Sequence, residues 1–302
     1  MILGRAAPHA QIVILHTALD RAEALGRLLR AEGHRVDIVG NFIVNNATGD
    51  AGGGIALDDS ARVFIINNTV AHNDSTATGP DAFGWPYFVN DPPGRYIPPG
   101  AGGGGLNVSV PQPAGIYSRA HSSGLQAAFG AGYGQDFSDP VLQDNIIVGN
   151  RSFYWDATAN DGSGAILPDP ATPIFWDLAV VGTSEIRLFH PTHCLLTTVD
   201  ITFPDGGTST YDASNLAADP LFVSPYFNVY QAGAVNEGAG NMVTVTFLPT
   251  GVRGDYRIGA GSPAVDRGAG TFLGSYPILA TDRDGQARPL GAGVDAGADE
   301  RQ

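Results

Sequence analysis

The chain has 302 residues, 43% of them hydrophobic, so it is long enough to bury a large core and too apolar to be disordered. It has 16 basic residues, all arginine, and 30 acidic residues. The resulting net charge of −14 excludes a broad nucleic-acid-binding surface. One cysteine excludes a disulfide framework and a multi-thiolate metal site, and no apolar run is long enough for membrane insertion.

Residues 1–40 differ in composition from the rest of the chain. The pattern predicts a buried strand at 11–15, a helix over 20–32 that Gly33 ends, and a second strand at 35–39. This unit resembles the start of a receiver domain, but His16-Thr17-Ala18-Leu19 stands where acidic metal ligands would follow the first strand. We therefore predict a strand–helix–strand cap without phosphoryl chemistry.

From residue 41 onward, short β-branched runs alternate with Asn, Gly and Asp. The segments 41–46, 68–73 and 145–150 each begin with Asn and carry a second Asn five places later. The first two lie 27 residues apart, and the third lies 77 residues further on, close to three such intervals. This period predicts a β-solenoid in which Ile43, Val70 and Ile147 form one core row and the Asn side chains form hydrogen-bonded ladders. An antiparallel sandwich is the rival fold.

Two groups of motifs carry a family resemblance. Residues 52–55 and 65–70 resemble the right-handed parallel β-helix repeats of pectin-lyase-like proteins. The chain end resembles the terminal signature of β-helix proteins of the choice-of-anchor Q type, through residues 218–222, 255–258, 261–268, 282–289 and 293–300. The resemblance implies an all-β, right-handed parallel β-helix over residues 41–302, preceded by the cap at 1–40. It also implies an extracytoplasmic or secreted protein, although no signal peptide is visible.

Long loops are predicted at residues 74–114, 157–173 and 204–218, which are rich in Gly, Pro and polar residues. Solenoids place insertions on one face, which is often the binding face. Trp85, Tyr87 and Tyr96 in the first loop are candidates for stacking on sugar rings. The alternative is that these aromatic side chains attach the loop to the wall of the β-helix.

Asp58 and Asp59 are the first candidates for catalysis. They end a predicted strand whose alternation directs Ile55 and Leu57 inward and Asp58 toward solvent. Adjacent carboxylates are similar to those of the polygalacturonase-type hydrolases of this fold, in which one acid protonates the leaving oxygen and another activates water. The other motifs of those enzymes are absent, and turn chemistry explains Asp-Asp-Ser equally well.

Arg119 and His121 are the candidates for a lyase. In the pectate lyases that the fold resembles, carboxylates bind Ca²⁺ and an Arg removes the proton, so Ca²⁺ is the one cofactor that this alternative requires. Residues 190–194 (His-Pro-Thr-His-Cys) could supply metal ligands, but no partner group of Cys or His exists, which favours a turn with a buried Cys194. No metal ligand is predicted.

The leading function is binding of a carbohydrate polymer, and possible processing of it, by an extracytoplasmic β-helix protein. The first alternative is a polysaccharide lyase or glycoside hydrolase acting on uronic-acid polymers. The second is a structural or adhesive surface module without catalytic activity. The expected partner is a polysaccharide, and the sequence leaves the oligomeric state open. The fold alone does not distinguish among these functions.

Overall fold

The computed structural model describes residues 2–3, 13–16, 35–79, 82–83, 107–129, 135–169, 172–183, 186–202, 207–236, 241–248 and 254–301. The described chain is nearly all-β and forms a parallel β-helix, so the predicted fold class is confirmed and the antiparallel sandwich is excluded. Four narrow sheets run along the stack. We name them sheet A (β1-β3-β7-β11), sheet B (β17-β10-β6-β2), sheet C (β21-β18-β12-β8-β4) and sheet D (β16-β13-β9-β5).

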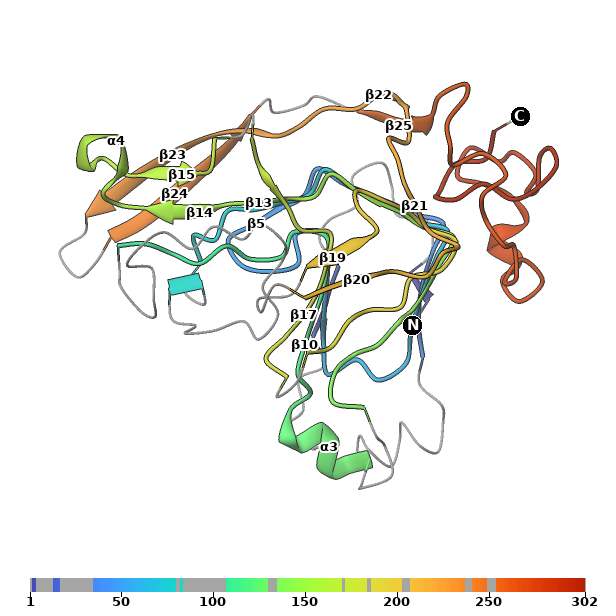
Figure 1. Ribbon diagram of the computed structural model, residues 1–302, viewed down its shortest axis with the longest axis horizontal. Coiled ribbons are helices and arrows are strands. Elements are labelled where there is room, and N and C mark those ends of the chain that lie inside the picture. Colours follow the sequence, from blue (N-terminus) through green and yellow to red (C-terminus); the bar gives the residue numbers. More distant parts are fainter. Residues whose placement is uncertain are drawn as a thin grey trace.

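Each coil passes through the sheets in the order A, C, D, B, and strands of successive coils superpose in Figure 1. The first complete coil contains β3 (Val36–Val39), β4 (Phe42–Val44), β5 (Ala47–Thr48) and β6 (Ile55–Asp58). The second contains β7 (Val63–Ile66), β8 (Thr69–Ala71), β9 (Asp74–Ser75) and β10 (Ile116–Arg119). The third contains β11 (Val141–Gln143), β12 (Ile146–Val148), β13 (Arg151–Ser152) and β17 (Leu178–Val181).

Further strands extend the sheets at both ends of the stack. β1 (Ile2–Leu3) and β2 (Val13–His16) precede the first coil, whereas β18 (Leu195–Leu196) and β21 (Leu216–Ala217) continue sheet C after the third. The two strands expected within residues 1–40 are present as β2 and β3, and they extend two different sheets, B and A. The helix predicted over 20–32 lies outside the described residues.

The remaining elements are strands in antiparallel pairs and a few short helices. Antiparallel pairs are β14 (Tyr154–Asp156) with β15 (Ala165–Leu167), β19 (Asp200–Thr202) with β20 (Thr208–Thr210), β22 (Phe222–Ser224) with β25 (Asp255–Ile258), β23 (Val229–Asn236) with β24 (Asn241–Leu248), and β16 (Ile174–Phe175) with β13. The helices are α3 (Ser123–Phe129), α4 (Ala159–Gly162) and the 3₁₀ helix η1 (Pro277–Ala280). The hairpins β14–β15 and β23–β24 project together from one side of the stack (Figure 1). In the described part of the chain, no helix has the length and hydropathy needed to cross a membrane.

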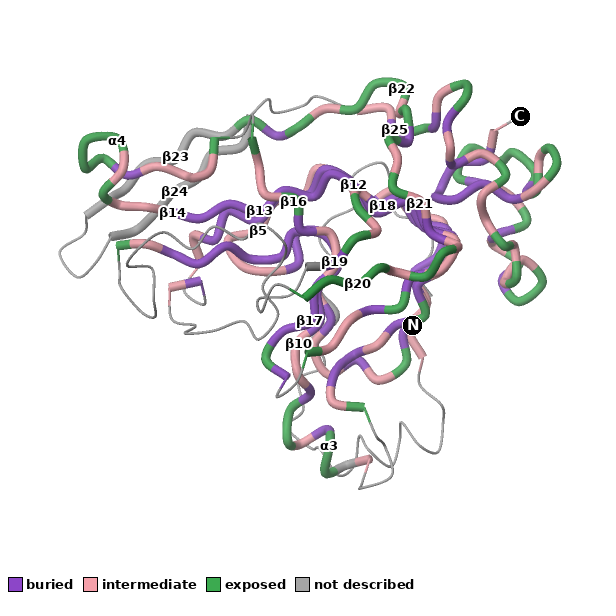
Figure 2. Tube along the Cα trace, in the orientation of Figure 1, coloured by how far each residue is buried: buried purple, intermediate pink, exposed green. Residues whose placement is uncertain are grey.

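The core consists of aligned rows of side chains from successive coils. The registers pair Ile43 with Val70, Val70 with Ile147, and Ile147 with Leu196, and all four side chains are buried. The predicted core row is therefore confirmed. Figure 2 shows the buried residues concentrated along these superposed strands, and exposed residues on the outer segments. A single coil could not shield this apolar row, so the stack is stable only as a whole.

Two ladders of asparagine side chains run through the stack, as predicted. In the first ladder, Asn41 donates its backbone N–H and Nδ2 to Oδ1 of Asn68 at 3.0 Å, and Asn68 donates likewise to Asn145 at 2.8 and 3.2 Å. The Cys194 Sγ then accepts the Asn145 N–H at 3.4 Å, and the Cys194 N–H donates to Oδ1 of Asn215 at 3.0 Å. The buried Cys194 thus continues a structural column.

The second ladder links Asn46, Asn73 and Asn150. Asn46 donates its N–H and Nδ2 to Oδ1 of Asn73 at 3.0 and 2.9 Å, and Asn73 donates likewise to Asn150 at 3.1 and 2.8 Å. Asn150 then donates both groups to Oδ1 of Asp177 at 3.1 and 2.7 Å. A carboxylate accepts hydrogen bonds but donates none, so Asp177 is a suitable last member of a column in which every donor points the same way.

The interval of 77 residues between the second and third repeats is one coil, not three. Asn145 is hydrogen-bonded directly to Asn68, and the registers place β12 on β8 without an intervening strand. The extra length lies in residues 76–115, between β9 and β10, and in residues 120–140, between β10 and β11. The near-multiple of 27 was therefore misleading, because insertions at the corners change the sequence interval without changing the stacking.

The segment 255–301 packs against the outer surface of the stack. Tyr276 and Leu279 contact the outward side chains Val39 and Ile66 of sheet A, and Ala296 joins the cluster around Ile146 of sheet C. Beyond β25 and η1 the segment has little regular structure, and its turns are fixed by polar side chains. It buries charged groups, which are Asp282, Arg288, Asp295, Asp299 and Glu300.

Candidate functional site

Asp58 and Arg119 lie at the ends of two neighbouring strands of sheet B. The register pairs Leu57 of β6 with Ser118 of β10, so Asp58 and Arg119 follow as the last residues of these strands. Leu57 and Ser118 are buried, whereas Asp58 and Arg119 are partly exposed. On the other side of β6, His16 of β2 is the register partner of Asp58. This outer row therefore combines the carboxylate of Asp58 and the guanidinium group of Arg119 from adjacent coils.

Asp59 and His121 follow these strands and come together. The Asp59 carboxylate lies 3.5 Å from Nδ1 of His121, measured from Oδ1. It also accepts the Ser122 N–H at 2.7 Å and the Ser122 hydroxyl at 2.5 Å. Asp59 has a positive φ of 50°, a conformation that Asp tolerates better than most residues and that turns its carboxylate toward β10. The structure therefore joins two of the predicted residues through an Asp59–His121–Ser122 contact.

The environment of His121 determines what this group can do. Its side chain is fully buried, and burial lowers its pKa, against the opposing effect of the nearby Asp59, Asp136 and Asp58 carboxylates. The neutral, buried imidazole lies beside Asp59 and does not reach solvent, while Ser122 donates the hydrogen bonds that hold the carboxylate in place. His121 is accordingly inaccessible to a ligand in this conformation, and the groups that a large ligand could contact are Asp58 and Arg119.

An ion pair between Asp136 and Arg187 flanks the site. The backbone N–H of His121 donates to the backbone oxygen of Asp136 at 2.7 Å, and the Asp136 carboxylate accepts Nε–H of Arg187 at 3.0 Å. Both side chains of this pair are about one-third exposed, at 32% and 38%. The site therefore carries carboxylates and guanidinium groups from several loops around the ends of β6 and β10.

The predicted aromatic residues Trp85, Tyr87 and Tyr96 lie outside the described residues. Their proposed stacking on sugar rings stays a prediction. The same holds for their alternative role in attaching the loop to the wall of the β-helix.

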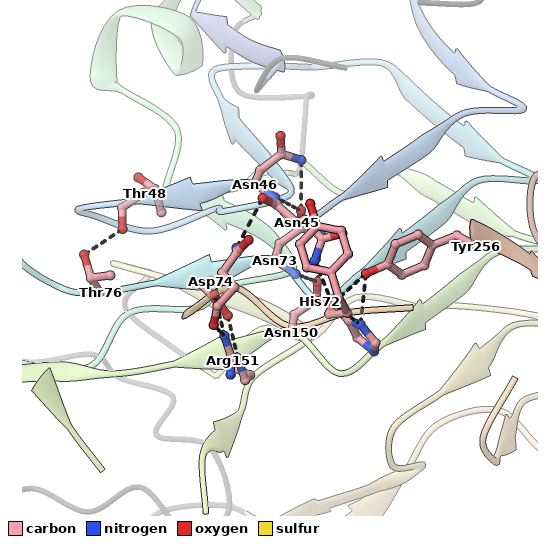
Figure 3. Close-up of polar contacts among 12 residues, drawn as sticks. Asn45, Asn46, Thr48, His72, Asn73, Asp74, Thr76, Asn150, Arg151 and Tyr256 are labelled. Atoms are coloured by element: carbon pink, nitrogen blue, oxygen red, sulfur yellow. Dashed lines mark hydrogen bonds and ion pairs between the residues drawn. The ribbon is translucent and has the colours of Figure 1, made fainter. Parts of the chain in front are cut away.

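A polar cluster that the sequence motifs did not predict lies at the corner between sheets C and D (Figure 3). Asp74 of β9 and Arg151 of β13 form a two-pronged ion pair, with Nε to Oδ1 and Nη2 to Oδ2 both at 2.7 Å. Their exposures are 0% and 2%, so this is a fully buried pair. His72 and Tyr256 lie beside it, with Nδ1 of His72 3.0 Å from the tyrosine hydroxyl. We call these groups, together with Asn45, the corner cluster.

Burial controls the charges of the corner cluster. It lowers the pKa of His72 to about 4, so this imidazole is neutral at pH 7. It raises the pKa of Asp74, while the hydrogen bonds and charge of Arg151 act in the opposite direction. Because Arg151 and Asp74 neutralise each other, the cluster presents neutral donors and one compensated ion pair.

The repeat itself contained the signal for this cluster. Asp74 and Arg151 each follow the second Asn of a repeat segment, and the register pairs them directly. Opposite charges at equivalent positions of neighbouring coils predict an ion pair, because equivalent residues stack. Aligning the repeats residue by residue, instead of using only their hydrophobic positions, would have found it.

Among the described residues, no group of three or more His, Cys, Asp or Glu side chains is arranged to hold a metal ion. The expected Ca²⁺ of a lyase therefore has no candidate ligand set in this part of the chain. Comparison of the chain with protein-family models, curated proteins and solved structures found no match.

Proposed function

We propose that the protein is an extracytoplasmic parallel β-helix protein that binds a carbohydrate polymer along its coil stack. The observation that carries this proposal is the outer row of sheet B, where Asp58 and Arg119 end neighbouring strands and Asp59 is held beside them. The resemblance to pectin-lyase-like proteins of the choice-of-anchor Q type supports it. A parallel stack also offers an extended ligand a repeating surface.

The chemistry of the row fits a polymer of acidic or hydroxyl-rich sugars. Neighbouring strands lie about 4.8 Å apart, so the two side chains can contact one sugar residue or two linked ones. Arg119 could bind a uronate carboxylate through paired hydrogen bonds, whereas Asp58 could accept hydrogen bonds from hydroxyl groups. Selective contacts by a few arginines are also the way in which a chain of net charge −14 can bind an acidic polymer.

Calorimetric binding to a panel of uronic and neutral polysaccharides tests the proposal, with and without Ca²⁺. We expect Asp58→Ala and Arg119→Ala each to weaken binding about tenfold, the loss that corresponds to about 1.4 kcal/mol. The matched controls Asp161→Ala and Arg283→Ala remove exposed side chains outside the row and should bind as the wild type does. If no polysaccharide binds, or if the control variants lose as much affinity as the row variants, the proposal is wrong.

One observation favours a second function, cleavage of the polymer. An arginine can serve as the base in β-elimination of a uronic-acid polymer, and the ends of the neighbouring strands β6 and β10 carry Asp58 and Arg119, with Asp59 directly after Asp58. Unsaturated ends that absorb ultraviolet light would establish a lyase, whereas new reducing ends without that absorbance would establish a glycoside hydrolase. Binding without either product would identify a binding protein, and no binding at all would favour a structural or adhesive module.

A further inference from the structure

The segment 226–228 lies across the corner cluster and satisfies its hydrogen bonds. The backbone oxygen of Tyr226 accepts Nδ2 of Asn45 at 2.8 Å, the Tyr256 hydroxyl at 2.8 Å and Nδ1 of His72 at 3.0 Å. Because a carbonyl can only accept, Nδ1 of His72 carries the proton. Three donors from three separate parts of the chain thus converge on a single oxygen atom.

Asn228 makes the corresponding contacts at the ion pair. Its backbone oxygen accepts Nη2 of Arg151 at 2.9 Å, and its Nδ2 donates to Oδ2 of Asp74 at 3.1 Å and to the backbone oxygen of Asn45 at 3.2 Å. The segment therefore presents two acceptor oxygens and one donor to the corner. Sugar rings offer the same groups, since each hydroxyl both accepts and donates hydrogen bonds.

Phe227, between these two residues, covers the cluster with its ring. The ring stacks on His72 with centroids 4.0 Å apart and an interplanar angle of 23°, and the Arg151 guanidinium lies 4.7 Å from its centroid. Gly149 makes room for this stack, because a Cβ there would lie 2.7 Å from the His72 ring. Phe227 itself is 42% exposed, so its ring lies at the surface of the molecule.

The attachment of the segment is mainly polar, through the six hydrogen bonds of Tyr226 and Asn228. Leu221, Val223 and Val229, which flank it, are exposed by 44%, 52% and 60%, and the apolar contacts of this stretch come from the rings of Phe222 and Phe227 against His72 and Tyr256. A stretch with few buried apolar side chains belongs to the less stable part of a fold. Opening it would uncover Asn45, His72, Asp74, Arg151 and Tyr256 together.

We propose that the corner cluster is a carbohydrate subsite and that the segment 226–228 closes it by occupying the positions of the sugar oxygens. This inference rests on the proposed function and adds a second contact region and its regulation. In the open state, the flat face of His72 would stack on a sugar ring, and Arg151, Asn45 and Tyr256 would bind its oxygens. Closure competes with the polymer, so the apparent affinity equals the intrinsic affinity of the open state multiplied by the fraction of open molecules.

The test compares a loosened segment with a matched control in the full-length chain. The double variant Phe227→Ala/Asn228→Ala removes the stacking and the side-chain hydrogen bonds, whereas Val223→Ala changes an exposed residue of the same stretch. We expect the double variant to increase amide hydrogen exchange at residues 221–229 and to tighten polysaccharide binding up to about tenfold. Val223→Ala should change neither quantity. Adding Tyr256→Phe to the double variant should reverse part of the gained affinity.

The outcomes separate this inference from the proposed function. Faster exchange with unchanged affinity would overturn the inference, while the effect of Asp58→Ala would still decide the proposed function. Unchanged exchange would also overturn it, because the segment would then be a fixed part of the fold. If only the loosened variant binds polysaccharide, the inference is supported. If neither form binds any polymer although exchange has increased, both proposals are wrong.

Discussion

The asparagine ladders and the C-terminal segment bury polar groups in opposite ways. The ladders use neutral amides that repeat once per coil, and each donates to the next in one direction. The segment 255–301 uses charged side chains at irregular positions, such as the buried Arg288–Glu300 pair at 3.1 Å. The coil stack is therefore stabilised by repetition, whereas the segment 255–301 depends on individual ionisable groups and hence on pH.

Breaking a ladder in its middle should have the largest effect on stability. Asn73→Ala removes the acceptor of both Asn46 groups and the donor to Ile43 and Asn150. We expect a loss of about 4 kcal/mol in the free energy of unfolding, because several buried groups lose their partners at once. Urea denaturation measures it. Asn46→Ala, at the first coil, should cost less than half as much, and equal losses would contradict a cooperative ladder.

Breaking the Arg288–Glu300 ion pair of the segment 255–301 should lower the free energy of unfolding slightly less. Arg288→Met at pH 8 leaves the buried Glu300 carboxylate without its cation, and we expect a loss of about 3 kcal/mol. At pH 5 the loss should be smaller, since Glu300 can take up a proton. Combining Arg288→Met with Glu300→Gln should recover part of the stability, and denaturation curves of all four forms complete the cycle.

The pH dependence of stability should distinguish the two regions directly. Burial raises the pKa of Glu300 to about 7 and that of Asp299 to about 6, so the folded state binds these protons more tightly than the unfolded state does. Their contribution is therefore complete at low pH and is lost as the pH rises through the range from about 5 to 8. We expect a decrease of about 2 kcal/mol over this range.

The difference between the wild type and Glu300→Gln isolates the contribution of Glu300, because that of Asp299 is common to both proteins. His72 acts with the opposite sign, because its pKa is lowered to about 4 and its folded form resists protonation. That contribution is common to both proteins and cancels in the difference. A difference that does not change between pH 5 and pH 8 would show that the pKa of Glu300 is not raised in the folded protein.

The smallest effect is expected where the first ladder changes residue type. Cys194 stands between Asn145 and Asn215, and Cys194→Asn would supply the amide that the column otherwise repeats. We expect a change below about 1 kcal/mol in the free energy of unfolding, because new amide hydrogen bonds offset the larger side chain. Cys194→Val, which leaves the Asn145 donor without an acceptor, should cost more. The reverse order would argue against the ladder continuing through this position.

The fold was largely predictable from the sequence because equivalent positions of successive coils require the same residue types, so the pattern repeats along the chain. Three Asn-bounded segments were sufficient to predict the parallel stack and the core row of Ile43, Val70 and Ile147. The coil count between the second and third segments was not predictable from the interval, since an insertion has no fixed length. The polar contacts of residues 255–301 were equally inaccessible, because no period relates Arg288 to Glu300.

The candidate site was predictable only in part. Asp59 and His121 are 62 residues apart, and their contact follows from the pairing of β6 with β10, which hydrophobic patterning alone does not fix. The corner cluster could be predicted only by aligning the repeats so that Asp74 and Arg151 occupy equivalent positions of neighbouring coils. The partners Tyr226 and Asn228 come from a non-repeating segment, so only the folded structure relates them to the stack.

The unequal links between sheets D and B have a practical consequence. Residues 49–54 join β5 to β6, and residues 76–115 join β9 to β10, yet both strands enter sheet B in the same register. Exchanging only the part of the longer link between the buried residues Ala82 and Ser109 should change mainly a closure entropy, by at most about 2 kcal/mol. The scaffold is therefore modular at this corner: foreign sequences could be grafted there while the coils above and below keep their alignment.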